Sequence, residues 1–228
     1  MIVTIDGPAG AGKSTVARTV AQRLGFDFLD TGAMYRCVTL AALRRQHDWR
    51  QPDQLAELAR HVRIRLDQGR VWLDNDDVSA EIRTVAVTNL IHYAANNPAV
   101  RERMVELQRE AGQGRNLVTE GRDQGTIAFP KAECKIFLTA SPEERARRRH
   151  AELVARGESA TYESILADQQ LRDERDANRS VGPLRPAPDA VTVVTDGKTR
   201  EQVIDELVQL VHTVQHRQES ARPSMEAS

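Results

Sequence analysis

The sequence predicts an α/β fold built on a parallel sheet. Residues 2–5 form a short apolar segment, and a glycine-rich turn and an amphipathic helix follow it. Further strand candidates lie at 26–30, 117–120, 135–138 and 190–194, with helical segments between them. Strands that alternate with helices pair in parallel through right-handed crossovers. The 228 residues are enough to bury about 70% of the unfolded surface in one core.

The first and last helices carry clear sequence signals. The first begins near Lys13, where Val16 and Val20 share one face, and Gly25 stands at the C-cap position. The last begins near Thr199, and Gln202 follows three residues later, which is the spacing of a capping box. We therefore expect the first helix to run from about Lys13 to Gly25 and the last helix to begin near Thr199.

Two stretches depart from the alternation of strands and helices. Residues 52–108 contain two short strand candidates, 62–66 and 70–73, which predict a small antiparallel insert flanked by helices. Residues 145–182 are dense in charge and predict a mobile helical pair with few core residues. Ser141, Pro142 and Glu144 mark the start of this pair, because they suit the N-cap, N1 and N3 positions.

Composition argues against several classes of protein. Lys and Arg number 32, Asp and Glu number 33, and aromatic residues are 4%, so binding of nucleic acid through bulk charge is not expected. No apolar run approaches the ~20 residues of a membrane span, and the N-terminus lacks a signal peptide. Two cysteines, Cys37 and Cys134, make no disulfide framework and indicate a reducing cytoplasm.

The segment GPAGAGKS at residues 7–14 fits the phosphate-loop pattern G-x-x-x-x-G-K-[ST] at every fixed position. Glycines allow successive backbone N–H groups to face one anion, and the following helix adds its positive N-terminal end. In this pattern Lys13 contacts the β- and γ-phosphates, and Ser14 holds Mg²⁺. The sequence therefore predicts a nucleoside triphosphate site.

Charged residues follow two other strands and one helix. Arg36 lies after the second strand, and the segment EGRDQGT (120–126) ends the third, at the edge where parallel sheets bind ligands. Arg172, Asp176 and Arg179 have the spacing of one helix face. Around a triphosphate loop, these arginines are suited to neutralise the charge of a transferring phosphoryl group.

The segments GPAGAGKST, LDTGAMYR, EGRDQGT, KIFLTASPEERARRR and RDERDANRSVGPL together resemble the bacterial-type cytidylate kinase family. The resemblance covers residues 2 to about 210. It implies a five-stranded parallel P-loop core (1–51, 109–144 and 183–219), an enlarged monophosphate-binding insert (52–108) and a helical lid (145–182). We expect residues 220–228 to form a disordered tail. The implied reaction is transfer of the γ-phosphoryl group of ATP, with Mg²⁺, to CMP or dCMP in pyrimidine nucleotide metabolism.

The resemblance also implies roles for individual residues. The ATP site would comprise Gly7, Pro8, Ala9, Gly10, Ala11, Gly12, Lys13, Ser14, Thr15 and Arg148. The CMP site would comprise Thr31, Tyr35, Arg36, Arg101, Arg122, Asp123, Arg172, Asp176 and Arg179, with Arg101 and Asp123 on the base and Arg172 and Asp176 on the ribose. The catalytic residues would be Lys13, Arg122 and Arg179, and the metal would lie on Ser14 and on Glu120, directly or through water. Arg145 and Arg149 are further lid-side candidates for ATP phosphates.

Two departures from the family pattern concern the base and the metal. His92 stands where some relatives have serine, and Glu120 replaces the aspartate of many monophosphate kinases.

Two alternative functions stay open: a P-loop kinase for UMP, AMP or a non-nucleotide acceptor, and a nucleotide-dependent switch. For the favoured interpretation we expect a cytoplasmic monomer that acts on small molecules, without nucleic acid or membrane partners.

Overall fold

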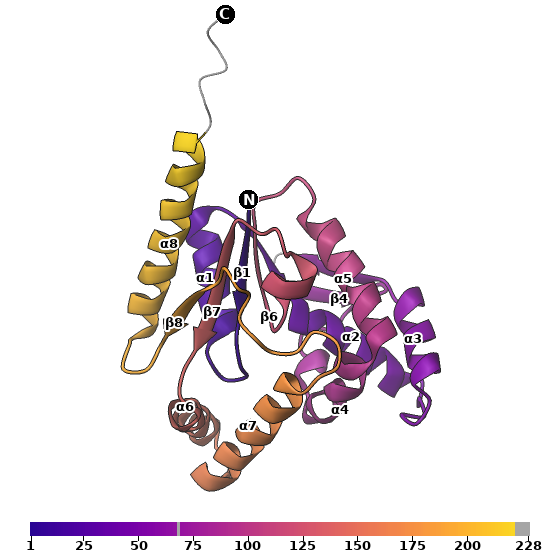
Figure 1. Cartoon of the computed structure of the whole chain (residues 1–228). Coiled ribbons are helices and arrows are strands. Elements are labelled where there is room, and N and C mark those ends of the chain that lie inside the picture. Colours follow the sequence, from indigo (N-terminus) through magenta and orange to yellow (C-terminus); the bar gives the residue numbers. More distant parts are fainter. Residues whose placement is uncertain (68, 222–228) are drawn as a thin grey trace, which may run out of the picture. The chain divides into compact units, whose positions relative to one another are not determined.

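The computed structural model describes residues 1–67 and 69–221, and it contains a five-stranded sheet (Figure 1). The strand order is β2 (Asp27–Asp30), β6 (Leu117–Gly121), β1 (Ile2–Asp6), β7 (Cys134–Thr139) and β8 (Val191–Val194). β1 pairs in parallel with both β6 and β7, and β7 pairs in parallel with β8. The predicted five-stranded parallel α/β core is confirmed.

The chain divides into two compact units. The first contains Met1–Phe28, Gly114–Asn178 and the residues from Pro183 onward, and the second contains Leu29–Gln113 and Arg179–Gly182. The predicted functional division into core, insert and lid stays a prediction. Residues 220 and 221 of the predicted tail belong to helix α8, and residues 222–228 lie outside the described part of the chain.

In the first unit, α1 (Lys13–Leu24) and α8 (Arg200–Ala221) pack together beside the sheet (Figure 1). Val16 and Val20 of α1 share a core with Leu207 and Val211 of α8. The expected caps are present. Gly25 ends α1 in the left-handed conformation, and the Thr199 hydroxyl and the Gln202 side chain bond each other's backbone N–H, at 3.2 and 2.9 Å.

The two charged helices also belong to the first unit. They are α6 (Pro142–Ala155) and α7 (Tyr162–Ala177), and Ser141 caps α6 by accepting the Glu144 N–H at 3.2 Å. Their shared core is small, with Ala146, Leu153 and Ile165 as its buried members. This confirms the prediction of a helical pair with few core residues.

The second unit is mostly helical. Its helices are α2 (Thr31–Arg44), α3 (Pro52–His61), the 3₁₀ turn η1 (Glu81–Arg83), α4 (Val85–Asn96) and α5 (Pro98–Gly112). β3 (Ile64–Asp67) and β4 (Arg70–Leu73) pair antiparallel, as the sequence predicts. A third strand, β5 (Asp76–Asp77), was not expected, because two aspartates carry no strand signal.

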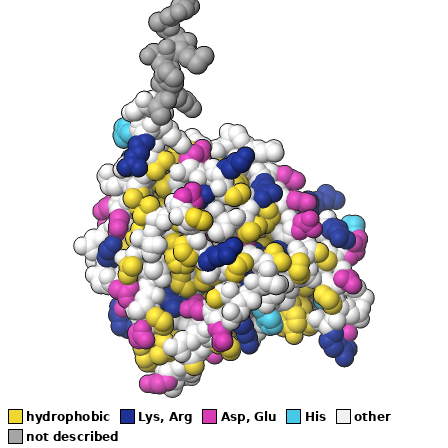
Figure 2. Space-filling model, in the orientation of Figure 1, with side chains coloured by type: hydrophobic (Ala, Val, Ile, Leu, Met, Phe, Trp, Pro, Cys, Tyr) yellow, Lys and Arg dark blue, Asp and Glu magenta, His cyan; other side chains and the backbone are white. Residues whose placement is uncertain are grey.

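Basic and acidic side chains are mixed on one face of the molecule (Figure 2). Figure 2 shows basic and acidic side chains interspersed on the face that it presents, in keeping with the net charge of −1. Within residues 1–67 and 69–221, no helix is both long and apolar enough to span a membrane.

Candidate functional site

The phosphate loop joins β1 to α1 in the first unit. Gly7 is required sterically, because a Cβ there would lie 1.9 Å from the carbonyl oxygen of Leu138. Gly12 is the N-cap of α1 and has a φ of +83°, in the left-handed region that favours glycine. No acidic residue occupies the first turn of α1. The loop therefore leads into a helix N-terminus whose partial positive charge is available to an anion.

Lys13 lies folded over this loop. Its side chain is buried, and Nζ donates a hydrogen bond to the carbonyl oxygen of Pro8 at 2.7 Å. Burial, together with the nearby charge of Arg122, lowers the pKa of Lys13 to about 7, although Glu120 and Asp6 oppose the shift. A triphosphate bound in the loop would reverse this effect, because its negative charge favours the ammonium form.

Ser14 and Glu120 lie side by side at the end of β6. The Ser14 hydroxyl donates to a carboxylate oxygen of Glu120 at 2.7 Å, and Glu120 is buried. A hydroxyl and a carboxylate oxygen at this separation suit Mg²⁺, which keeps waters and phosphate oxygens as its other ligands. Among the described residues, no group of three His, Cys, Asp or Glu side chains forms a metal site. The Ser14 hydroxyl and the Glu120 carboxylate therefore fit a Mg²⁺ ion that would take its other ligands from phosphate oxygens and water.

Asp6 fixes the turn that follows β6. It is buried at the end of β1, and its two carboxylate oxygens accept the N–H groups of Gln124 and Gly125 at 2.8 and 2.7 Å. Burial raises the pKa of Asp6 to about 6, and the two hydrogen bonds moderate the rise. Asp6 belongs to none of the motifs that the sequence analysis singles out. The sequence feature that could have indicated this role is a carboxylate placed directly after an apolar strand and before the phosphate loop.

The same turn orients Asp123. Its side chain is buried, and its main-chain carbonyl accepts the N–H groups of Ile127 and Ala128 at 2.8 and 3.2 Å, within the π-helical turn η2 (Gln124–Ala128). Single π-helical turns are rare and often occur at functional sites. Asp123 is thus a buried carboxylate on a backbone that hydrogen bonds hold in place. A carboxylate of this kind is suited to recognise the polar edge of a nucleobase.

Arg122 connects β6 to α7. Its Nε donates to Asp176 Oδ2 at 2.8 Å, so two residues predicted for the acceptor site lie together in the first unit. Arg172 lies four residues earlier on α7 and has an exposed side chain. The expectation that Arg179 shares this helix face is wrong. α7 ends at Ala177, where the Asn178 N–H bonds the Glu174 carbonyl, and Arg179 belongs to the second unit.

The lid-side arginines have different partners. Arg148 donates to Glu144 at 2.7 Å and to the Thr195 hydroxyl and carbonyl at 3.0 and 2.8 Å, so its guanidinium is tied to the loop after β8. Its role on ATP phosphates stays a prediction. Arg149 pairs with Glu152 at 3.2 Å. Arg145 alone among these three is buried, with partners that are described below.

The remaining candidates gather in the second unit, around the start of α2. Thr31 begins α2. Arg36 Nη1 donates to the Ile82 carbonyl and the Thr88 hydroxyl, both at 2.9 Å. Arg101 is buried, donates to the Ala95 carbonyl at 3.0 Å, and lies 5.7 Å from the ring centre of Tyr35. Thr88 carried no sequence signal, because a threonine on an apolar helix is unremarkable.

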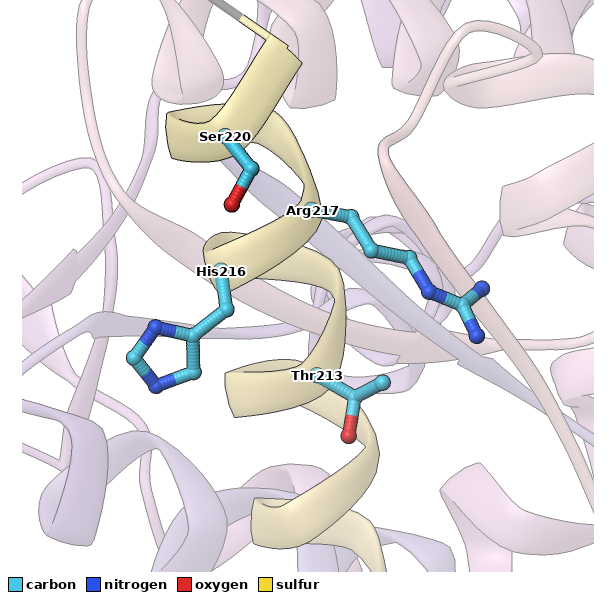
Figure 3. Close-up of a pocket in the computed structure, with 4 residues that line it drawn as sticks. All are labelled: Thr213, His216, Arg217 and Ser220. Carbon is cyan, nitrogen blue, oxygen red and sulfur yellow. The ribbon is translucent and has the colours of Figure 1, made fainter.

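Three histidines outside these groups, His92, His212 and His216, have local contacts. His92 lies against Tyr93, with ring centres 4.2 Å apart, and its Nδ1 is 2.8 Å from the Asn89 carbonyl oxygen. On α8, His212 is 3.0 Å from Gln215. Farther along α8, Thr213, His216, Arg217 and Ser220 line a pocket, and Figure 3 shows that the His216 and Arg217 side chains point in different directions. Side chains that diverge from a single helix offer no convergent site.

The sequence is similar to cytidylate kinases over most of its length. A family model described as cytidylate kinase matches residues 3–213. A cytidylate kinase of Rhodopirellula baltica is 53% identical over 211 residues, which is 92% of this chain and 92% of that protein. A cytidylate kinase of Mycobacterium avium is 49% identical over 216 residues, or 92% of this chain and 95% of that protein.

One solved structure shares the fold at low sequence identity. It is an uncharacterized protein from Eubacterium ventriosum, 10% identical, with a TM-score of 0.51 over 93% of this chain and 99% of that chain. This likeness concerns the fold alone. The match to the family model extends over the phosphate loop, the turn after β6 and helix α7. The chain belongs to the cytidylate kinase family.

Proposed function

We propose that this chain transfers the γ-phosphoryl group of ATP to CMP and dCMP, yielding ADP and the cytidine diphosphate. The observation that carries the proposal is the phosphate loop with Lys13, Ser14 and Glu120 assembled at its end, in a chain of the cytidylate kinase family. We further propose that the enzyme acts as a cytoplasmic monomer on small-molecule nucleotides.

The reaction needs alignment and charge neutralisation from the protein. A phosphate oxygen of CMP attacks the γ-phosphorus, and the bond from that phosphorus to the β–γ bridging oxygen breaks, so ADP leaves with the electron pair. The attacking oxygen is already anionic, and no general base is required. Ser14, and Glu120 directly or through water, would hold Mg²⁺, which would supply positive charge to the phosphates. Lys13, Arg122 and Arg179 would stabilise the charge that develops on the transferred group.

Recognition of the acceptor would draw on two sets of residues. Arg36, Arg122 and Arg179 would surround the acceptor phosphate near Thr31 and Tyr35, and Arg172 with Asp176 would hold the ribose. Asp123 would accept from the cytosine 4-amino group, while Arg101 donates to the neighbouring N3 and O2 atoms. Uracil presents a carbonyl oxygen at C4, which would face the Asp123 carboxylate with no hydrogen between them. Such a mismatch rejects the wrong substrate by up to about 10⁴-fold.

The test is kcat/KM for a panel of nucleoside monophosphates, measured with the wild type and with Asp123→Asn. We expect CMP and dCMP first, then UMP, then AMP, whose two-ring base is too wide for a pyrimidine site. Asp123→Asn should narrow the gap between CMP and UMP, because an amide can donate to the uracil carbonyl. Equal wild-type values for CMP and UMP, or slow ATP hydrolysis without consumption of any acceptor, would exclude the proposal. The second result would favour a nucleotide-dependent switch.

A further inference from the structure

Arg145, which starts the charged helix pair, has the partners of a structural residue. It is 2% exposed. Its Nε donates to the Ala140 carbonyl at 3.1 Å, Nη1 to the Ala9 carbonyl at 2.9 Å, and Nη2 to Asp173 Oδ2 at 2.6 Å. One guanidinium therefore joins the end of β7, the phosphate loop and helix α7. A side chain buried on these three partners is poorly placed to be a phosphate ligand itself.

The contact with Ala9 sets the direction of the next N–H group. In a planar trans peptide, the carbonyl of one residue and the N–H of the following residue point in opposite directions. Because the Ala9 carbonyl points toward Arg145, the N–H of Gly10 points away from Arg145 and toward the other side of the loop. Backbone N–H groups aimed in this way are what a phosphate loop offers to an anion.

Helix α7 lies directly against the loop at the same place. A Cβ added to Gly10 would come within 3.0 Å of Gln169 Nε2 and 3.4 Å of Arg145 Cβ. Gln169 is 6% exposed, and its Oε1 is buried without a hydrogen-bond partner among the described residues. Four residues later on the helix, Asp173 bonds Arg145, and Asp176 bonds Arg122 at 2.8 Å. α7 thus contacts the loop and also holds an arginine predicted for the acceptor site.

We propose that Arg145 is a positioning residue, which aims the Gly10 N–H into the phosphate loop and, through Asp173, makes that geometry depend on helix α7. Binding of a triphosphate in the loop would then stabilise the position of α7 and of the Arg122–Asp176 pair. The coupling is reciprocal: the factor by which triphosphate binding favours the docked position of α7 is also the factor by which the docked position favours triphosphate binding. Loosening α7 must therefore weaken triphosphate binding. This inference rests on the proposed phosphate-binding role of the loop and not on the identity of the acceptor.

The direct test replaces Asp173 and measures binding rather than turnover. Asp173→Asn removes the charge that pairs with Arg145, and Asp168→Asn, on an exposed part of the same helix, is the matched control. Calorimetry well below the melting temperature should show that Asp173→Asn weakens a non-hydrolysable ATP analogue by roughly fivefold or more. The control should stay within about twofold of the wild type. A purely structural role would lower the melting temperature and leave the affinity unchanged, and that result would overturn the inference.

A second measurement needs no variant. Tripolyphosphate with Mg²⁺ has no base or ribose, so it probes the loop alone. Added to the wild-type chain, it should slow amide hydrogen exchange over residues 165–177 as well as in the loop. Protection of the loop with unchanged exchange in α7 would also overturn the inference. Neither measurement involves an acceptor, so a failure of the CMP assignment would show separately, in the substrate panel.

Discussion

Helices α1 and α7 both contact the phosphate loop, but different forces hold them. α1 buries Val16 and Val20, with two alanines, in the core that it shares with the sheet and α8. α7 buries Ile165 and Gln169, and two arginine–carboxylate pairs attach it to its unit, Arg145–Asp173 at 2.6 Å and Arg122–Asp176 at 2.8 Å. Apolar burial is non-directional, whereas charged hydrogen bonds fix orientation.

The difference suggests a division of labour between the two helices. α1 provides a stable base for the loop, because opening it would expose a large apolar core. α7 exposes little apolar surface when it separates, so its local stability should be low. The polar pairs determine where α7 lies when it is docked. We therefore expect nucleotides to change the position of α7 more than that of α1.

The largest expected effect lies at the start of α1. Lys13→Ala should lower kcat by about 10²–10³, because it removes a preorganised charge from the phosphate loop. The melting temperature should change little, since the side chain contacts the loop rather than the apolar core. Steady-state assays with ATP and CMP measure the effect. Lys131→Ala, at an exposed lysine, is the control, and more than a tenth of wild-type turnover in Lys13→Ala would contradict the assignment.

The contrast between the two helices also explains what sequence could predict. The loop, the start of α1 at Lys13, the Gly25 cap and the Ser141 cap follow from local patterns, and each is present. The role of Arg145 does not follow from local sequence. It stands near the run Arg147, Arg148, Arg149, yet its partner Ala9 is 136 residues away in the chain.

Two other residues show the same limit. The two backbone N–H groups that Asp6 accepts lie 118 and 119 residues along the chain, so its anchoring role depends on the pairing of β1 with β6. Arg179 lies seven residues after Arg172, which is a helical spacing, but the helix ends at Ala177. The spacing therefore does not place the two side chains on one helix face. At both positions the charged residue type suggests a role, but the contacts that the residue makes can be known only from the tertiary structure.

Hydrogen exchange should separate the two helices directly. In the nucleotide-free chain, we expect amides of α7 to exchange at least about tenfold faster than those of α1, because α7 has few buried apolar contacts. CMP with a non-hydrolysable ATP analogue should slow exchange in residues 145–182 and in 52–108, since phosphoryl transfer requires exclusion of water. Mass spectrometry of the labelled peptides measures both effects. Unchanged exchange in both segments would exclude closure over the nucleotides.

Deleting one apolar side chain from each helix sharpens the comparison. Val20→Ala should lower the free energy of unfolding by about 2 kcal/mol, because Val20 is fully buried in the main core. Ile165→Ala removes more apolar volume, but from the small α6–α7 cluster. We expect it to change the global urea midpoint less than Val20→Ala does and to speed exchange in α7 more. The opposite ranking would mean that α7 unfolds only together with the core.

The smallest expected effect is a fraction of a proton taken up by Lys13. Burial lowers the pKa of Lys13 in the nucleotide-free chain to about 7, so part of the molecules carry a neutral Lys13 near neutral pH. Triphosphate charge favours the ammonium form, so binding should take up a fraction of a proton, and affinity should fall as pH rises through this region. Calorimetry in buffers of different ionisation enthalpy gives the proton count. Protons that the nucleotide itself gains or loses count in both the wild type and Lys13→Gln. The difference in proton count between the two proteins therefore reports on Lys13. An equal proton count in both proteins, together with a ratio of wild-type to variant affinity that stays constant between pH 6 and 8, would show that Lys13 is already charged before the nucleotide binds.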